Sequence, residues 1–238
     1  MKKIMLSSLL FLSLSMAQDV TMYVWAKSFN HTKTSVLLDD LEGKNVLISA
    51  SADKKKLKEF AESHSAGIEI LCGYNTWVYK KNRYKIDKVM KSISKLKNID
   101  TISLDVEPYS IPKLKHHREK FLQMYIDMLD YIQTNYPDYR INISIPVFYY
   151  KYPTYLSQMS YYADKIYLMA YKYRNMAHLI RKYNHFRRYQ NKLVVVFNVK
   201  DFHSKTQLNK DIKMFKRLTG QRDIALHSYK YIKKLSNH

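Results

Sequence analysis

Short apolar runs rich in β-branched and aromatic residues alternate with amphipathic stretches from residue 20 to the end of the chain. Runs of this kind predict buried strands, and apolar residues at a spacing of three or four predict helices with one buried face. Eight strands are predicted, at 20–26, 45–50, 67–73, 100–107, 139–147, 164–171, 192–199 and 222–229. Five helices are predicted between them, at 52–63, 85–96, 115–135, 173–189 and 206–218.

The order of these elements predicts the fold class. Strands that alternate with helices are typical of parallel βαβ units, and eight such units predict an α/β protein with a single (β/α)8 barrel. A doubly wound open sheet is the alternative. The connections 27–43 and 145–163 show no clear helical pattern, so we expect long loops there. Loops that follow strands form the face on which such barrels bind their ligands.

The beginning of the chain has the pattern of a secretory signal peptide. Two lysines precede an apolar run at 4–14, and the small-residue pattern Ser15-Met16-Ala17 follows it. We therefore expect residues 1–17 to be removed by cleavage near Ala17 and residues 18–238 to form an exported barrel, periplasmic or secreted. An uncleaved membrane anchor is the alternative, although a spanning helix needs roughly 20 apolar residues. No later segment is long and apolar enough, so we expect no transmembrane span in the mature chain.

The charge balance of the chain bears on its partners. The formal net charge is +21, from 41 Lys and Arg against 20 Asp and Glu. Such a balance favours an anionic polymer as a partner, for example an acidic polysaccharide or another cell-wall polymer. The lysines are scattered from Lys27 to Lys234, so an evenly basic surface without a specific partner is the alternative. No nucleic acid partner is expected, because no helix-turn-helix, zinc-finger or RNP pattern occurs.

Several residue types exclude whole classes of chemistry. Cys72 is the single cysteine, so we expect no disulfide framework and an inert, buried thiol. The four glycines form no Gly-rich phosphate loop, and no cofactor is expected. The nine histidines show no H-x-H or H-E-x-x-H spacing, so no metal site is predicted. A serine nucleophile is not indicated either, because the chain has no G-x-S-x-G motif.

The segment DTISLDVEPYS, residues 100–110, places two carboxylates near the end of the fourth predicted strand. Side chains on a strand alternate between its faces, so the apolar residues at 102, 104 and 106 face the helices. Ser103, Asp105 and Glu107 then face the interior of the barrel. A structural pair, capping a helix or forming ion pairs, is the alternative interpretation.

The ends of the other predicted strands converge on the same axial site. Their side chains are Trp25, Ser49, Met169, Tyr171, Asn198 and His227. Trp25, together with Trp77 in a loop, is expected to stack on the apolar face of a sugar ring, while polar groups bind the hydroxyls.

Two motifs resemble those of glycoside hydrolase family 18, the chitinase-like barrels. That family has D-x-x-D-x-D-x-E at the end of its fourth strand, and DTISLDVE, ending at Glu107, lies at the fourth predicted strand here. Its sixth strand ends in M-x-Y-D or a close variant, and MAYK, Met169 to Lys172, ends the sixth predicted strand here. The chain therefore resembles a divergent member of that family.

This resemblance implies a glycoside hydrolase that cleaves a glycan containing N-acetylhexosamine, and the predicted signal peptide implies that it is exported. Glu107 would be the general acid, and Asp105 and Tyr171 would bind the acetamido group of the substrate. The acetamido oxygen itself would attack the anomeric carbon, which is an exception to the two-carboxylate scheme and gives retention of configuration. Further substrate contacts are expected from Trp25, Trp77, Ser103, Met169, Asn198 and His227.

Three residues depart from the pattern of the family. Ser103 replaces an aspartate that supports the position of Asp105, Lys172 replaces an acid or amide, and His227 lies near where many members have a tryptophan platform. Two alternatives therefore stay open: a catalytically impaired barrel that binds cell-wall or matrix polysaccharide without turnover, and a hydrolase for another amino-sugar polymer. Asp201, just past the seventh strand, is the one further carboxylate that could act as nucleophile or base.

Overall fold

The computed structural model describes residues 20–114, 116–173 and 175–235, so the predicted signal peptide lies outside the described residues. The strands are β1 (Val20–Val24), β2 (Val46–Ser49), β3 (Ile68–Cys72), β4 (Thr101–Leu104), β5 (Arg140–Pro146), β6 (Lys165–Met169), β7 (Leu193–Asn198) and β8 (Ile224–His227). Each pairs in parallel with the next, and β8 pairs with β1 to close the barrel. The (β/α)8 fold is confirmed, and the closing pair excludes an open sheet.

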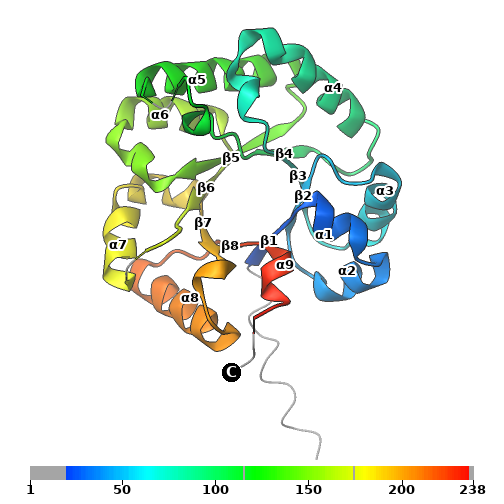
Figure 1. The fold of residues 1–238 in the computed structure, drawn as a ribbon, viewed down its shortest axis with the longest axis vertical. Helices are drawn as coiled ribbons and strands as arrows, with labels where there is room; N and C mark the ends of the chain where they lie inside the picture. The colour runs from blue at the N-terminus through cyan, green and yellow to red at the C-terminus, as the bar shows by residue number, and fades with distance from the viewer. Residues whose placement is uncertain (1–19, 115, 174, 236–238) are drawn as a thin grey trace, which may run out of the picture.

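A ring of helices surrounds the barrel (Figure 1). Five of them lie where the sequence predicts helices: α3 (Lys54–Ser63), α4 (Arg83–Ile93), α5 (Arg118–Asn135), α7 (Met176–Asn184) and α8 (Lys205–Thr219). Their apolar residues recur at helical spacing and are buried against the strands. No helix in the described part of the chain is long and apolar enough to cross a membrane.

The two predicted long loops contain helices, so that prediction is wrong. α1 (Ala26–His31) and α2 (Thr34–Asp40) fill the first connection, and α6 (Pro153–Tyr162) fills much of the second. α1 and α2 are short and bury one residue each, Phe29 and Leu37, which is too few to show a period. The shorter segments are η2 (Asn75–Val78), η3 (Lys80–Asn82), η4 (Pro108–Ser110), η5 (Val147–Lys151), η6 (Arg187–Lys192), η7 (Val199–Asp201) and α9 (Tyr229–Ile232).

The strands place alternate residues in two separate cores. The core inside the barrel contains Tyr23, Leu47, Leu71, Tyr167, Val194, Val196 and Ala225. Ile102, Leu104 and Val106 belong to the larger core between strands and helices, as predicted. Ser103 is fully buried, and its hydroxyl group contacts the side chain of Glu69 from β3. The alternation predicted for β4 is therefore confirmed.

A buried carboxylate, Glu69, connects four strands in the interior of the barrel. It accepts hydrogen bonds from Ser103, from Asn142 Nδ2 at 2.9 Å and from the hydroxyl of Tyr167 at 2.8 Å. The ammonium group of Lys165 lies 3.8 Å from Oε1 of Glu69, the oxygen that also accepts from Tyr167. Buried charge is tolerated only when it is paired and hydrogen-bonded, and Glu69 meets both conditions.

The single cysteine behaves as the sequence predicts. Cys72 is fully buried on β3, and burial raises the pKa of its thiol to about 12. The thiolate is the reactive form of cysteine, so this side chain is inert at neutral pH.

Candidate active site

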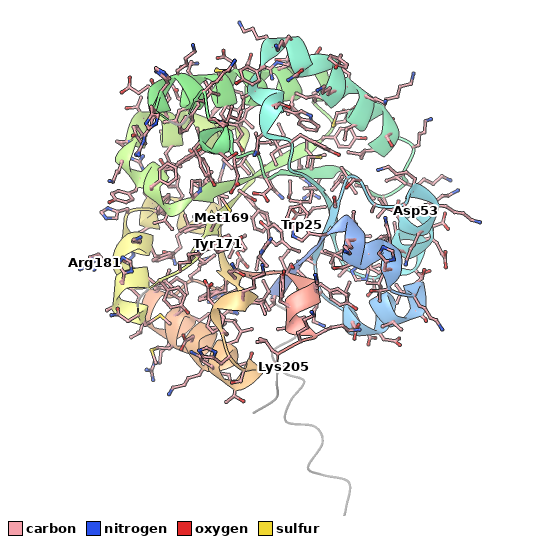
Figure 2. The ribbon with its side chains drawn as sticks, viewed as in Figure 1. Trp25, Asp53, Met169, Tyr171, Arg181 and Lys205 are labelled. Carbon is pink, nitrogen blue, oxygen red and sulfur yellow. The ribbon has the colours of Figure 1, made fainter. Side chains whose placement is uncertain are left out.

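The carboxyl ends of the strands bring the candidate residues to one mouth of the barrel. Trp25 follows β1, Asp105 follows β4, and His227 ends β8. Figure 2 shows Trp25, Met169 and Tyr171 around the centre of the barrel, whereas Asp53, Arg181 and Lys205 lie at its periphery. In barrels of this type, the mouth formed by these strand ends is where active sites lie.

Asp105 is a half-buried carboxyl group held at the end of β4. Its backbone N–H donates to the Cys72 carbonyl at 2.9 Å, so Asp105 extends the strand by one more residue. Its Oδ1 atom is buried without a hydrogen-bond partner. Burial and then the charge of Glu107 raise the pKa of Asp105 to about 7. Near neutral pH this carboxyl group therefore changes its charge.

Glu107 is held in place from its backbone and from its carboxylate. Its backbone N–H donates to Asn75 Oδ1 at 2.7 Å, and the hydroxyl of Tyr109 donates to its Oε1. The Asn75 amide also donates to Ser110 Oγ at 2.7 Å, which joins η2 to η4. Nothing in the sequence indicates the role of Asn75, because Asn75 does not lie at a strand end, and nothing predicts the contact between Tyr109 and Glu107.

Tyrosine hydroxyls surround the two carboxylates. Burial is the largest cause that raises the pKa values of Tyr171 and Tyr23 well above 10, and the nearby charge of Asp105 adds to it in both cases. For Tyr109, burial again comes first and the hydrogen bond to Glu107 second. These phenols therefore remain neutral donors. The charges of both Asp105 and Glu107 contribute to the raised pKa of Tyr171, so its hydroxyl lies near both carboxyl groups.

Trp25 and His227 are hydrogen-bonded to each other at the mouth of the barrel. The indole Nε1–H donates to His227 Nε2 at 3.0 Å. Because an indole nitrogen can only donate, His227 Nε2 must be the acceptor of a neutral imidazole. Burial and the charge of Lys200 lower the pKa of His227, which agrees with a neutral ring. The rings of Tyr171 and Tyr23 lie 5.7 Å and 5.4 Å from the imidazole, so aromatic surface lines this side of the mouth.

Lys172 is exposed and adopts a left-handed conformation with φ of 52°. Its backbone N–H donates to Asp201 Oδ2 at 2.8 Å. In the described part of the chain no hydrogen bond or ion pair joins its ammonium group to Asp105 or Glu107. The carboxylate of Asp201 lies near Tyr171, where it contributes to the raised pKa of that phenol.

The remaining candidates differ in how far they face the mouth. Met169 ends β6 and is 8% exposed. Ser49 ends β2, and its hydroxyl group is hydrogen-bonded to the hydroxyl group of Ser51 at 2.9 Å. Asn198 ends β7 and accepts from the Lys200 N–H at 3.1 Å, which caps η7. Trp77 was expected to contact ligand, but only 1% of its surface is exposed and it belongs to the outer core. The indole could not be assigned from the sequence, because a loop tryptophan packs inward as readily as outward.

Comparison with known proteins gives similarity in structure but not in sequence. No model of a protein family matches the chain, and no curated protein matches it. A family 18 chitinase from Crocus vernus matches with a TM-score of 0.61 and 11% identity, covering 90% of this chain and 94% of that chain. The catalytic domain of a family GH18 chitinase from the fern Peteris ryukyuensis gives 0.58 and 11%, covering 89% and 92%. The glycoside hydrolase domain of PelA from Pseudomonas aeruginosa gives 0.59 and 10%, covering 90% and 96%.

The fold is that of a glycoside hydrolase-like (β/α)8 barrel. At identities of 10–11%, this likeness shows the fold alone. The mouth of this barrel holds two neighbouring carboxyl groups, neutral phenol donors and the aromatic rings of Trp25, Tyr171 and His227. Among the described residues, no group of three His, Cys, Asp or Glu side chains could hold a metal ion.

Proposed function

We propose that this protein is an exported glycoside hydrolase that cleaves a glycan containing N-acetylhexosamine by a substrate-assisted, retaining mechanism. The observation that carries the proposal is the Asp105–Glu107 pair at the mouth of a glycoside hydrolase-like barrel, with one buried carboxylate oxygen still unpartnered. Hydrolases that need two separate catalytic carboxylates are less well matched, since Asp201, the further candidate named from the sequence, accepts a hydrogen bond from the Lys172 backbone N–H.

In the proposed reaction, Glu107 protonates the glycosidic oxygen as the bond to the anomeric carbon breaks. The acetamido oxygen of the same sugar attacks that carbon and forms a cyclic intermediate, while Asp105 accepts a hydrogen bond from the acetamido N–H. Tyr171 donates to the acetamido oxygen and keeps it oriented. Glu107, now ionised, removes a proton from the water that opens the intermediate, so the configuration is retained.

The buried carboxyl group of Asp105 stores the proton that this division of roles requires. Burial, and then the charge of Glu107, keep that proton on Asp105 until the pH approaches 7. In the proposed reaction Asp105 passes the proton to Glu107, which then acts as the acid, and the ionised Asp105 accepts from the acetamido N–H. The rate should therefore fall as the pH rises through about 7.

A second candidate is a barrel that binds glycan without cleaving it. It is favoured by Ser103, whose hydroxyl group contacts Glu69 rather than Asp105, so the aspartate lacks the support that the family pattern implies. The aromatic wall of Trp25, His227 and Tyr171 would still bind a sugar ring under this interpretation.

Product analysis by mass spectrometry separates the two candidates. The purified protein and its Glu107→Gln variant are incubated with N-acetylglucosamine oligomers and with peptidoglycan glycan strands. We expect cleavage by the parent and a loss of at least about a hundredfold in the variant, because the acid is removed. Glu119→Gln, an exposed acid in the first turn of α5, is the matched control. Retention of the oligomers by both proteins with no cleavage would support the binding barrel and overturn the enzyme.

A further inference from the structure

A cavity outside the mouth is lined by residues of α3 and α4 and of the segment after β3. Helices α3 and α4 are neighbours in the outer ring (Figure 1). The volume of the cavity is about 340 Å³, within the range of roughly 300–1,000 Å³ that is typical of small-ligand sites. We call it the lysine–tyrosine pocket, and the side chains used below are Lys54, Tyr74, Trp77, Lys85, Lys88 and Val89.

The floor of the lysine–tyrosine pocket is aromatic. Tyr74 is 42% exposed, and its ring stacks on Trp77 with centroids 5.2 Å apart and an angle of 24°. The buried indole fixes the orientation of the tyrosine ring, so Tyr74 presents a rigid face to solvent. Flat aromatic faces of this kind pack on the apolar face of a sugar ring while its hydroxyls remain in water.

The charged side chains around this aromatic floor are all positive. Lys85 and Lys88 lie on one face of α4, beside Val89, and Lys54 begins α3. No acidic residue lines the pocket, and among the described residues none of the three lysines forms an ion pair. Burial lowers the pKa of Lys54, whose ammonium group donates to the Ala50 carbonyl at 2.7 Å.

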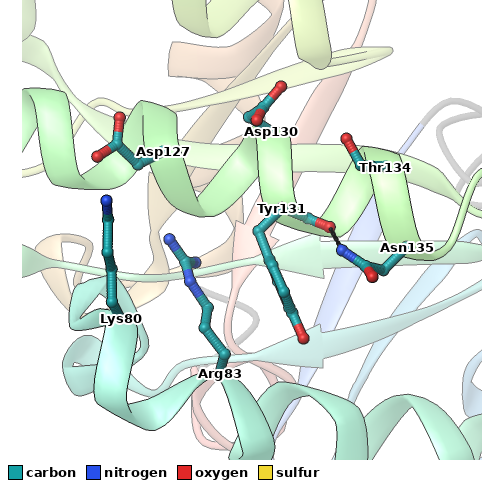
Figure 3. Close-up of a pocket in the computed structure, with 7 residues that line it drawn as sticks. All are labelled: Lys80, Arg83, Asp127, Asp130, Tyr131, Thr134 and Asn135. Atoms are coloured by element: carbon teal, nitrogen blue, oxygen red, sulfur yellow. Dashed lines mark hydrogen bonds between the residues drawn. The ribbon is translucent and has the colours of Figure 1, made fainter.

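A larger groove on the other side of α4 has both positive and negative side chains in its lining. That groove has a volume of about 490 Å³, and Figure 3 shows Lys80 and Arg83 on one side of it and Asp127 and Asp130 of α5 on the other. The guanidinium of Arg83 also lies 4.9 Å from the centre of the Tyr131 ring. Its cations therefore have acids and a ring nearby, whereas the lysine–tyrosine pocket has cations without acids.

We propose that the lysine–tyrosine pocket is a second glycan-binding site that takes an acidic sugar residue. Tyr74 packs against the ring of the sugar, and Lys85 and Lys88 pair with its carboxylate or sulfate group. Three cations without an acidic partner among the described residues are complementary in charge to such a group, and the aromatic floor favours a sugar over a free anion.

The pocket is adjacent to the mouth along the chain and in space. Tyr74 directly follows Gly73, and a β-carbon at Gly73 would lie 3.4 Å from the Asp105 carbonyl and 3.9 Å from the Trp25 ring. One polymer that runs over Gly73 could therefore occupy the mouth and this pocket together. Binding at two linked sites raises the overall affinity without any new contact at the mouth.

Calorimetric titration of the purified protein tests the site. The probes are a galacturonate hexasaccharide, with one carboxylate on each sugar, and a neutral N-acetylglucosamine hexasaccharide. We expect Tyr74→Ala to weaken galacturonate binding about tenfold and the double variant Lys85→Gln/Lys88→Gln about fivefold, with the remaining affinity falling as salt is added. The matched control is Lys91→Gln/Lys97→Gln, which removes two exposed lysines outside the pocket.

Three results would overturn the proposal. They are an equal loss in the control double variant, unchanged binding in Tyr74→Ala, or tighter binding of a single-stranded oligonucleotide that Tyr74→Ala abolishes. Galacturonate binding is measured by calorimetry without turnover, so the result does not depend on whether the mouth cleaves a glycan. The pocket and the proposed enzyme can therefore fail independently.

Discussion

At the scale of single residues, the charge of Asp105 should oppose folding. Its pKa rises from 3.8 to about 7 in the folded protein, so the stability that comes with the neutral form is present in acid and lost as the pH rises through 7. We predict that Asp105→Asn raises the free energy of unfolding by about 1–3 kcal/mol near pH 8 and changes it little near pH 4. Urea unfolding at the two pH values measures the difference. The same gain at both pH values, or a gain in the exposed control Asp138→Asn, would contradict this account.

The buried carboxylate of Glu69 should stabilise the folded protein, in contrast to the charge of Asp105. All three groups that donate to it come from other strands, and an amide at this position would direct its N–H₂ group toward at least one of these donors. We predict that Glu69→Gln lowers the free energy of unfolding by about 1–3 kcal/mol. The control is Glu62→Gln on α3, whose side chain is 60% exposed, and it should change the value by less than about 0.5 kcal/mol. A smaller effect at Glu69 than at Glu62 would show that the network contributes nothing.

At the scale of elements, the site depends on a contact between two loops. Asn75 of η2 accepts from the Glu107 N–H and donates to Ser110 of η4. We predict that Asn75→Ala leaves that N–H without its partner, lowers the free energy of unfolding by about 1–2 kcal/mol and reduces turnover more than substrate binding. Steady-state kinetics with N-acetylglucosamine oligomers would show the effect on kcat. Asn82→Ala, which removes only a bond to the Thr76 carbonyl, should leave kcat unchanged.

The strands and the carboxyl pair could be predicted because both follow from local alternation. Each of the eight strands lies within its predicted run, and the period of two places Asp105 on the inner face with Ser103. Helices α1 and α2 could not be predicted, since each buries a single residue. The hydrogen bonds of Glu69 and of Asn75 could not be predicted from the sequence either, because they join distant residues. The three partners of Glu69 are 34, 73 and 98 positions away from it, and Glu107 is 32 positions away from Asn75.

At the scale of the whole molecule, the net charge of +21 should make the folded state sensitive to salt. Like charges on a compact surface repel one another, and salt screens that repulsion over about 10 Å at 0.1 M ionic strength. We predict that the Tm rises by a few degrees between about 0.01 M and 0.3 M sodium chloride. Differential scanning calorimetry provides the measurement. An unchanged or falling Tm would mean that attractive pairs outweigh the excess of lysine.

The coupled pair of Asp105 and Glu107 is the claim on which the proposed chemistry depends, and it can be tested without a substrate. A carbon-13 NMR titration follows every side-chain carboxyl group in the protein and in the Glu107→Gln variant. We predict that one carboxyl resonance titrates near pH 7, is absent from Asp105→Asn, and titrates at lower pH in Glu107→Gln because the neighbouring charge is gone. If every carboxyl group in the parent titrates below about pH 5, the pKa of Asp105 is not raised and the account is wrong.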